Sequence, residues 1–148
     1  MYSLIGRLTL MGMMVSVLPL AACSQHESHA AHAEHPAQVD KIEGSELSRV
    51  TLTEKAAERI GLETTSVREQ DLDGSLRKMV PYSSLIYDPK GRTWIYTSPQ
   101  RRTFVRQQVE VDRIDGDWVF LADGPAAGTE VASVGVAEIY GAETGVGH

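Results

Sequence analysis

The sequence predicts an all-β fold, a small antiparallel barrel with one short helix. Runs rich in β-branched and aromatic residues, such as residues 93–97 and 118–122, fill the second half of the 148-residue chain. Gly, Pro or Asp interrupts these runs every several residues, which is typical of antiparallel strands joined by tight turns. Asp115-Gly116 is a strong signal for one such hairpin.

The predicted helix lies between the first two predicted strands. Residues 48–52 and 62–67 have strand character, and residues 54–60 have helical character. Thr53 stands at the N-cap position of this helix and Gly61 at its C-terminal end, as helix capping favours. Residues 68–78 are polar and contain an Asp-Gly turn, which predicts either a loop or a hairpin. Further strands are expected at residues 82–87, 93–97, 103–114, 118–122 and 130–136.

Alternation within the strands predicts which side chains are buried. In the long strand, the parity of Val105, Val109 and Val111 suits the core, and the opposite parity of Arg106 suits water. Residues 118–122 have large apolar side chains at both parities, so this strand is expected to be buried on both faces. Trp94, Trp118 and Phe120 are either core residues or binding aromatics, and core packing is the favoured interpretation.

Residues 1–22 have the pattern of a signal peptide. Arg7 precedes an almost wholly apolar run that ends at Leu20, and this run is short for a membrane span, which needs about 20 apolar residues. The sequence Leu-Ala-Ala-Cys at residues 20–23 resembles a bacterial lipobox. We therefore expect cleavage before Cys23 and lipidation of its thiol, with simple secretion or a retained membrane anchor as the alternatives. Ser24 after the cysteine favours the outer membrane over the inner one.

Residues 23–46 are rich in Ala, His, Glu, Gln and Ser, which predicts a flexible tether. Four histidines in it are spaced three residues apart: His26, His29, His32 and His35. Imidazole binds Zn, Cu and Ni, and such a tract can capture these ions or Ag weakly. A polar linker of biased composition is the competing interpretation. We expect no required cofactor.

Charge and motif content exclude several classes of function. The formal net charge is −6 and no basic stripe is present, so nucleic-acid binding is not expected. Cys23 is the only cysteine, which excludes an intrachain disulfide. After the tether the chain has no Cys and one His, the terminal His148, and the common catalytic motifs are absent. The sequence therefore predicts no enzyme.

Five segments resemble the periplasmic adaptor (membrane-fusion) subunits of RND-type efflux pumps, especially the heavy-metal branch. They are residues 50–67, 80–86, 94–96, 104–109 and 124–131. In that family the membrane-proximal domain is discontinuous, with its first strands at the start of the chain and the rest at the end. A β-barrel, a lipoyl-like domain and a helical hairpin lie between them. Here residues 68–79 join the two parts directly.

The resemblance implies an accessory lipoprotein of a Gram-negative envelope, facing the periplasm. Its partners would be the membrane, through lipidated Cys23, and an RND pump or a full-length adaptor. On exposure alone, the candidate docking residues are Lys90, Arg92, Arg101 and Arg102. Two alternatives remain: a free lipoprotein that buffers metal through the His tract, and a degenerate remnant or structural lipoprotein. The expected organisation is a signal peptide (1–22), a tether (23–46), a β domain (47–140) and a flexible tail (141–148).

Overall fold

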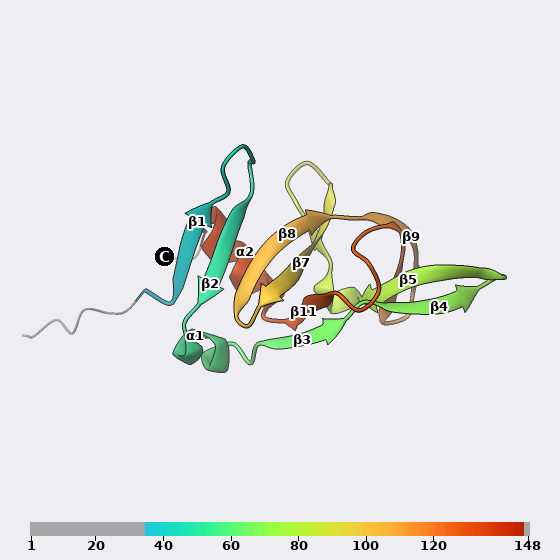
Figure 1. Cartoon of the computed structure of the whole chain (residues 1–148), viewed down its shortest axis with the longest axis horizontal. Helices are drawn as coiled ribbons and strands as arrows, with labels where there is room; N and C mark the ends of the chain where they lie inside the picture. Colours follow the sequence, from blue (N-terminus) through green and yellow to red (C-terminus); the bar gives the residue numbers. More distant parts are fainter. Residues whose placement is uncertain (1–34, 147–148) are drawn as a thin grey trace, which may run out of the picture. The chain divides into compact units, whose positions relative to one another are not determined.

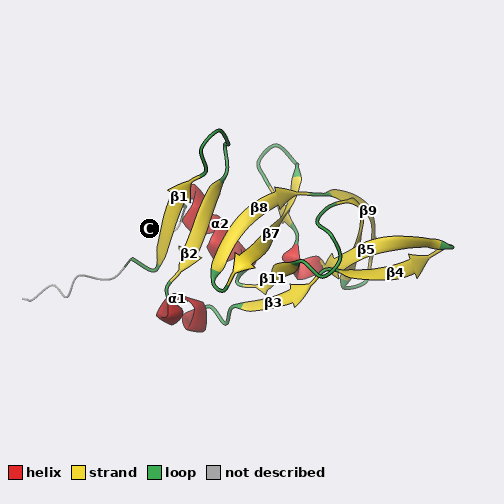
Figure 2. Cartoon of the chain, in the orientation of Figure 1, coloured by secondary structure: helices red, strands yellow, loops and turns green. Residues whose placement is uncertain are grey.

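Two antiparallel sheets and two short helices make up residues 35–146, the part of the chain that the computed structural model describes (Figure 1). The helices are α1 (Glu54–Arg59) and α2 (Val136–Thr144), and a single 3-10 turn spans Tyr82–Ser84. Neither helix has the length and hydropathy that crossing a membrane would require. Strands account for most of the remaining ribbon (Figure 2).

Sheet A has seven strands and draws on both halves of the described chain. Its strands follow the order β1-β2-β8-β7-β11-β3, with β6 beside β7. The bounds are β1 (Ala37–Lys41), β2 (Ser48–Leu52), β3 (Glu63–Ser66), β6 (Ile86–Tyr87), β7 (Thr93–Gln100), β8 (Thr103–Gln108) and β11 (Glu130–Val134). β2 pairs with β8, and β3 pairs with β11. Early and late strands therefore belong to one hydrogen-bonded unit.

Sheet B has four strands in the order β4-β5-β10-β9. They are β4 (Arg68–Leu72), β5 (Ser75–Pro81), β9 (Glu110–Asp115) and β10 (Trp118–Asp123). Asp73 and Gly74 link β4 to β5 with φ values of 55° and 83°, as a two-residue hairpin turn of this kind requires. Of the two sequence interpretations for this region, loop or hairpin, the structure has the hairpin.

Two hydrophobic clusters hold these elements together. The first packs sheet A against the helices and includes Val50, Tyr96, Phe104 and Ile139. The second contains residues of both sheets and comprises Val67, Val80, Ile95, Val109, Val119, Leu121 and Val131. Ile95 and Tyr96 are neighbours that belong to different clusters, since successive side chains of a strand point to opposite faces. β7 is therefore buried on both faces, at the centre of the fold.

Several sequence predictions are confirmed in detail. β2 has the predicted bounds, and the side-chain Oγ1 of Thr53 accepts a hydrogen bond from the Ala56 N–H at 3.1 Å, which caps α1. Gly61 follows the helix with φ +61°. Val119, Phe120 and Leu121 are all less than 5% exposed, so β10 is buried on both faces as expected. Trp94 and Phe120 are buried, in agreement with core packing, whereas Trp118 is partly exposed.

The all-β prediction holds in its coarse form, but the barrel is not found. Within residues 35–146 both sheets are open: β1 and β3 end sheet A, and β4 and β9 end sheet B. The predicted helix is α1, and the structure adds a second helix, α2, which covers the end of the predicted β domain and part of the predicted flexible tail. Val136 and Ile139 bury one side of α2 in the first cluster, and this burial stabilises a helix that contains an internal glycine.

Other boundaries also differ. β1 lies inside the predicted tether, because residues 37–41 gain a full ladder of hydrogen bonds from β2. Residues 82–87 form a 3-10 turn and the short β6 instead of one strand. The long strand predicted for residues 103–114 is broken at Val109, which separates β8 in sheet A from β9 in sheet B. The chain thus changes sheets at this valine, which is 4% exposed.

Candidate functional site

The residues predicted for lipidation and metal binding fall largely outside the described part of the chain. Cys23, His26, His29 and His32 precede residue 35. His35 is described and exposed. From residue 35 to residue 146, no three His, Cys, Asp or Glu side chains are grouped so that they could hold one metal ion.

Lys90 and Arg92, two of the candidate docking residues, belong to a turn built around Asp88. The carboxylate of Asp88 accepts hydrogen bonds from the backbone N–H groups of Lys90 and Arg92, each at 2.9 Å. It also accepts from Arg92 Nε at 2.7 Å and from Trp94 Nε1 at 3.1 Å. Burial would raise the pKa of Asp88, but these hydrogen bonds outweigh it and lower the pKa to about 2. Arg92 is thus engaged within the turn, while Lys90 is exposed.

Arg106 lies in a buried polar network that sequence reasoning missed. Its Nη2 lies 3.3 Å from Glu143 Oε1, and the two side chains are only 12% and 4% exposed. The Tyr96 hydroxyl donates a hydrogen bond to Glu143 Oε2. Burial, and then this hydrogen bond, raises the pKa of Tyr96 far above its usual value. The guanidinium of Arg106 stacks on the rings of Trp94 and Tyr140, at 4.5 Å and 5.7 Å.

The prediction that Arg106 faces water was wrong. Alternation within β8 was assigned from the valines, but the structure buries Phe104 and Arg106 on the helix-covered side, and Val105 is only partly buried. The ion pair joins β8 to α2, two elements far apart in the sequence, so local patterns carry no signal for it. Its effect is to fix the C-terminal helix on sheet A.

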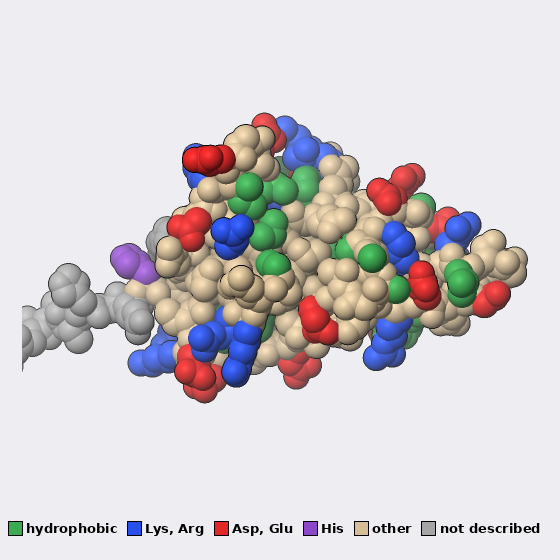
Figure 3. All heavy atoms as spheres, viewed as in Figure 1, with side chains coloured by type: hydrophobic (Ala, Val, Ile, Leu, Met, Phe, Trp, Pro, Cys, Tyr) green, Lys and Arg blue, Asp and Glu red, His purple; other side chains and the backbone are tan. Residues whose placement is uncertain are grey.

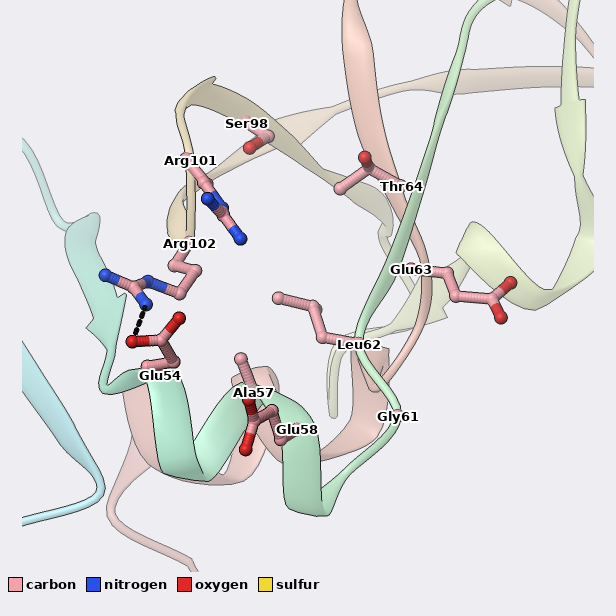
Figure 4. Close-up of a pocket in the computed structure, with 10 residues that line it drawn as sticks. All are labelled: Glu54, Ala57, Glu58, Gly61, Leu62, Glu63, Thr64, Ser98, Arg101 and Arg102. Carbon is pink, nitrogen blue, oxygen red and sulfur yellow. Dashed lines mark ion pairs between the residues drawn. The ribbon is translucent and has the colours of Figure 1, made fainter.

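Arg101 and Arg102, the other candidate docking residues, border a cleft of about 420 Å³ (Figure 4). They form the turn between β7 and β8, and Arg102 has φ +61°, a left-handed conformation that is costly for a residue with a Cβ. Arg102 Nη1 lies 3.7 Å from Glu54 Oε2 on α1. In Figure 4 the side chains of Arg101 and Leu62 point into the cleft, whereas Glu63 points away from it.

The chemistry of this cleft suits binding. Its ten lining residues include three exposed glutamates and two arginines around a small apolar floor, and none of the ten is His or Cys. Such a surface can recognise polar or peptide groups. On the face of the molecule seen in Figure 3, side chains of both signs are present along the whole length of the described part.

A larger and more apolar groove of about 790 Å³ lies between β1, α1 and α2. Val39, Leu52, Ile60, Ala142 and Val146 are among the apolar residues that line it. Its polar lining includes His35, Arg59 and Glu138. The groove brings the start of the described chain next to its end, an arrangement that sequence patterns do not predict.

Comparison of the chain with protein-family models, with curated proteins and with solved structures finds no match.

Proposed function

We propose that this chain is a lipid-anchored envelope protein that acts by docking onto an efflux assembly, in the manner of the membrane-proximal domain of an RND adaptor. The supporting observation is the composition of sheet A, in which β3 pairs with β11 and β2 pairs with β8. The resemblance implies a domain made from an early and a late part of the chain. Here both parts share one sheet, and the β4–β5 hairpin connects them through a two-residue turn.

This arrangement suits an accessory component rather than a bridging adaptor. The segments that resemble the family lie in the two sheets, and we infer that these sheets stand in place of the family's small barrel. The family's helical hairpin contacts the outer-membrane channel, and the chain passes from β4 to β5 where that hairpin would be inserted. The proposed role is therefore to contact a pump or a full adaptor at one membrane, without catalysis.

The test is crosslinking and affinity purification from native membranes, with a C-terminal tag that leaves Cys23 free for lipidation. A Cys23→Ser variant is the matched control for anchoring. We expect the wild-type protein to recover an RND pump or a full adaptor, and we expect the variant to recover less. If neither component is recovered and deletion of the gene leaves metal resistance unchanged, the docking function is wrong.

A second candidate function is metal buffering, which the regular spacing of the four histidines favours. A tract of imidazoles without a fixed geometry would bind soft and borderline ions weakly and with little selectivity. Titration with Zn, Cu(II) and Ag(I) separates this function from docking. We expect any binding to disappear in a variant with His26, His29, His32 and His35 changed to Ala. Equal binding by both proteins would exclude the tract as the site.

A further inference from the structure

Sheet B carries a row of four side chains in which two arginines flank two apolar residues. Arg68 on β4 is directly paired with Met79 on β5, and Met79 is paired with Phe120 on β10. Phe120 is paired in turn with Arg113 on β9. Directly paired residues of antiparallel strands point to the same face of the sheet, so these four side chains lie side by side across all four strands.

This row points away from the hydrophobic cluster that the two sheets share. The neighbouring row contains Val80, Val119 and Ile114, and its two valines belong to the cluster shared with sheet A. Because the side chains of a strand alternate, Met79 and Phe120 must lie on the opposite face. They belong to neither cluster, yet they are only 6% and 4% exposed. Neither cluster therefore accounts for their burial.

Two arginines stack on aromatic rings of this face. The guanidinium of Arg113 lies 5.6 Å from the ring centre of Phe120, and that of Arg68 lies 5.3 Å from the ring centre of Trp118. A stacked guanidinium is held in one orientation, and its N–H groups remain directed along the plane, where a carboxylate can accept two of them. Fixing the side chain in advance reduces the entropy that is lost on binding.

The charges of these stacked arginines are weakly compensated. Within residues 35–146 no carboxylate lies within ion-pair distance of Arg68, and the nearest to Arg113 is Asp73 at 3.9 Å. The side chain of Asp73 is 87% exposed, so this contact contributes little. Both guanidinium groups can therefore accept a further anionic partner.

We propose that this arginine–aromatic face, comprising Arg68, Met79, Arg113, Trp118 and Phe120, binds a carboxylate-bearing surface of a partner protein. Met79 and Phe120 are buried beneath the accessible side chains of Arg68, Arg113 and Trp118. Arg and Trp are enriched in protein interfaces and are frequent among the residues that dominate binding energy. The inference rests on the proposed docking function and assigns a surface to it.

The charge pattern favours an acidic protein over an anionic membrane. The whole chain has a formal net charge of −6, and Asp115 is paired with Trp118 on the same face. Asp112 lies 3.5 Å from Arg77 at the edge of the face. A uniformly negative lipid surface would repel these carboxylates together with the rest of the protein. A protein partner can place its acids opposite Arg68 and Arg113 alone, which gives specificity.

The experiment is photocrosslinking in cells from Gln70→p-benzoylphenylalanine in the full-length lipidated protein. Gln70 is exposed and shares a face with Arg68, two residues earlier on β4. The same photoreactive residue at Arg49, an exposed position on β2, is the positional control. We expect a protein adduct from position 70 but not from position 49, with acidic residues around the crosslinked site in the partner peptide identified by mass spectrometry.

Charge reversal tests the chemistry of the contact. We expect R68E/R113E to reduce the adduct about tenfold or more, because two oriented cations become repulsive. R49E/K55E changes the net charge equally on other elements and is expected to leave the adduct unchanged. Lysine or arginine in place of the partner's acidic residues should restore the adduct of R68E/R113E. If R68E/R113E does not fold, as judged by circular dichroism, R68Q and R113Q replace it.

Each outcome decides between the possibilities. A lipid adduct, an adduct with a second copy of this chain, or no adduct from position 70 overturns the inference. An adduct that survives R68E/R113E or R68Q and R113Q overturns it as well. An acidic partner that is not an efflux component supports this face but refutes the proposed function. Recovery of an RND pump or adaptor that crosslinks only from position 49 supports the function but refutes this face.

Discussion

Arg106 in sheet A and Arg68 in sheet B both stack on a tryptophan ring, at 4.5 Å and 5.3 Å, yet only Arg106 has a carboxylate beside it. In sheet A, helix α2 packs near β1 and β2 and contributes Glu143. In sheet B the stacked face points away from the shared cluster, and the described chain supplies no equivalent acid to Arg68.

The same stacking arrangement therefore has different surroundings in the two sheets. Where a helix brings a carboxylate, arginine and aromatic ring become part of the interior and fix the helix. Where none does, the arginine stacks on the ring and its N–H groups have no carboxylate partner within the described residues. Arg92 is an intermediate case, because it lies 5.1 Å from the ring of Trp94 but pairs with Asp88 in its own turn.

The largest expected effect is on sheet A. Glu143→Ala would leave Arg106 buried and unpaired, so we expect a loss of about 3–5 kcal/mol in the free energy of unfolding. Urea denaturation followed by tryptophan fluorescence measures this loss. Glu138→Ala, at an exposed position of the same helix, is the control and should change stability by less than about 0.5 kcal/mol. A loss below about 1 kcal/mol for Glu143→Ala would show that the ion pair does not hold α2.

Asp88, the carboxylate that pairs with Arg92, should make the stability of the protein depend on pH. Because the folded pKa of Asp88 is about 2 and the ordinary value is 3.8, its ionised form stabilises the fold above about pH 4, and this contribution is lost as the pH falls toward about 2. We expect Asp88→Asn to melt several degrees below the wild type at neutral pH. The difference should shrink progressively between about pH 4 and pH 2. A difference in melting temperature that is constant with pH would contradict the low pKa of Asp88.

A smaller stability effect is expected on the open face of sheet B. R68Q/R113Q removes two cation–π contacts of about 0.5–1 kcal/mol each, so we expect a combined loss of about 1–2 kcal/mol. No buried counter-charge is left behind, in contrast to Glu143→Ala. Thermal unfolding of the purified domain measures the loss, with R49Q/K55Q as the matched control. A loss as large as that of Glu143→Ala would mean that Arg68 and Arg113, like Arg106, are required for the stability of the fold.

The smallest expected stability changes come from two glycine substitutions, one in the β4–β5 hairpin of sheet B and one in helix α2. Gly74 has φ +83°, and Gly74→Ala is expected to cost about 1 kcal/mol because an L-residue is strained there. Gly141 lies inside α2, where an added Cβ would meet only ordinary contacts, so Gly141→Ala should stabilise the protein by about 0.5–1 kcal/mol. Melting temperatures of the two variants should therefore move in opposite directions. If both melting temperatures moved in the same direction, either the left-handed conformation of Gly74 or the helical conformation of Gly141 would be contradicted.

Sequence patterns predicted the local features of the fold well. The cap formed by Thr53, the Asp73-Gly74 hairpin option and the double burial of β10 each depend on neighbouring residues only. The patterns failed where long-range packing decides the structure. β1 is polar on its own and becomes a strand because β2 offers a hydrogen-bonding edge. α2 has a glycine in its interior and becomes a helix because the first cluster buries Ile139.

The candidate docking residues remain predictions, but the structure shows that they differ in how they are engaged. Exposure alone suggested Lys90, Arg92, Arg101 and Arg102, but the structure engages Arg92 with Asp88 and pairs Arg102 with Glu54. Which arginines are already paired depends on residues brought together by folding, and no local pattern reports it. The lipidation and metal-binding predictions for Cys23 and the first three histidines of the tract remain predictions from the sequence.

The sequence by itself determined the strand-rich class, most turn positions and the helix cap, because these depend on the conformational preferences of a few adjacent residues. Tertiary structure alone decided that the chain forms two open sheets and that α2 covers one face of sheet A. It also decided which arginines are paired with carboxylates. The physical reason is that burial and ion pairing depend on distances between residues remote in sequence. Folding brings Arg106 next to Glu143, whereas no carboxylate of the described chain lies within ion-pair distance of Arg68.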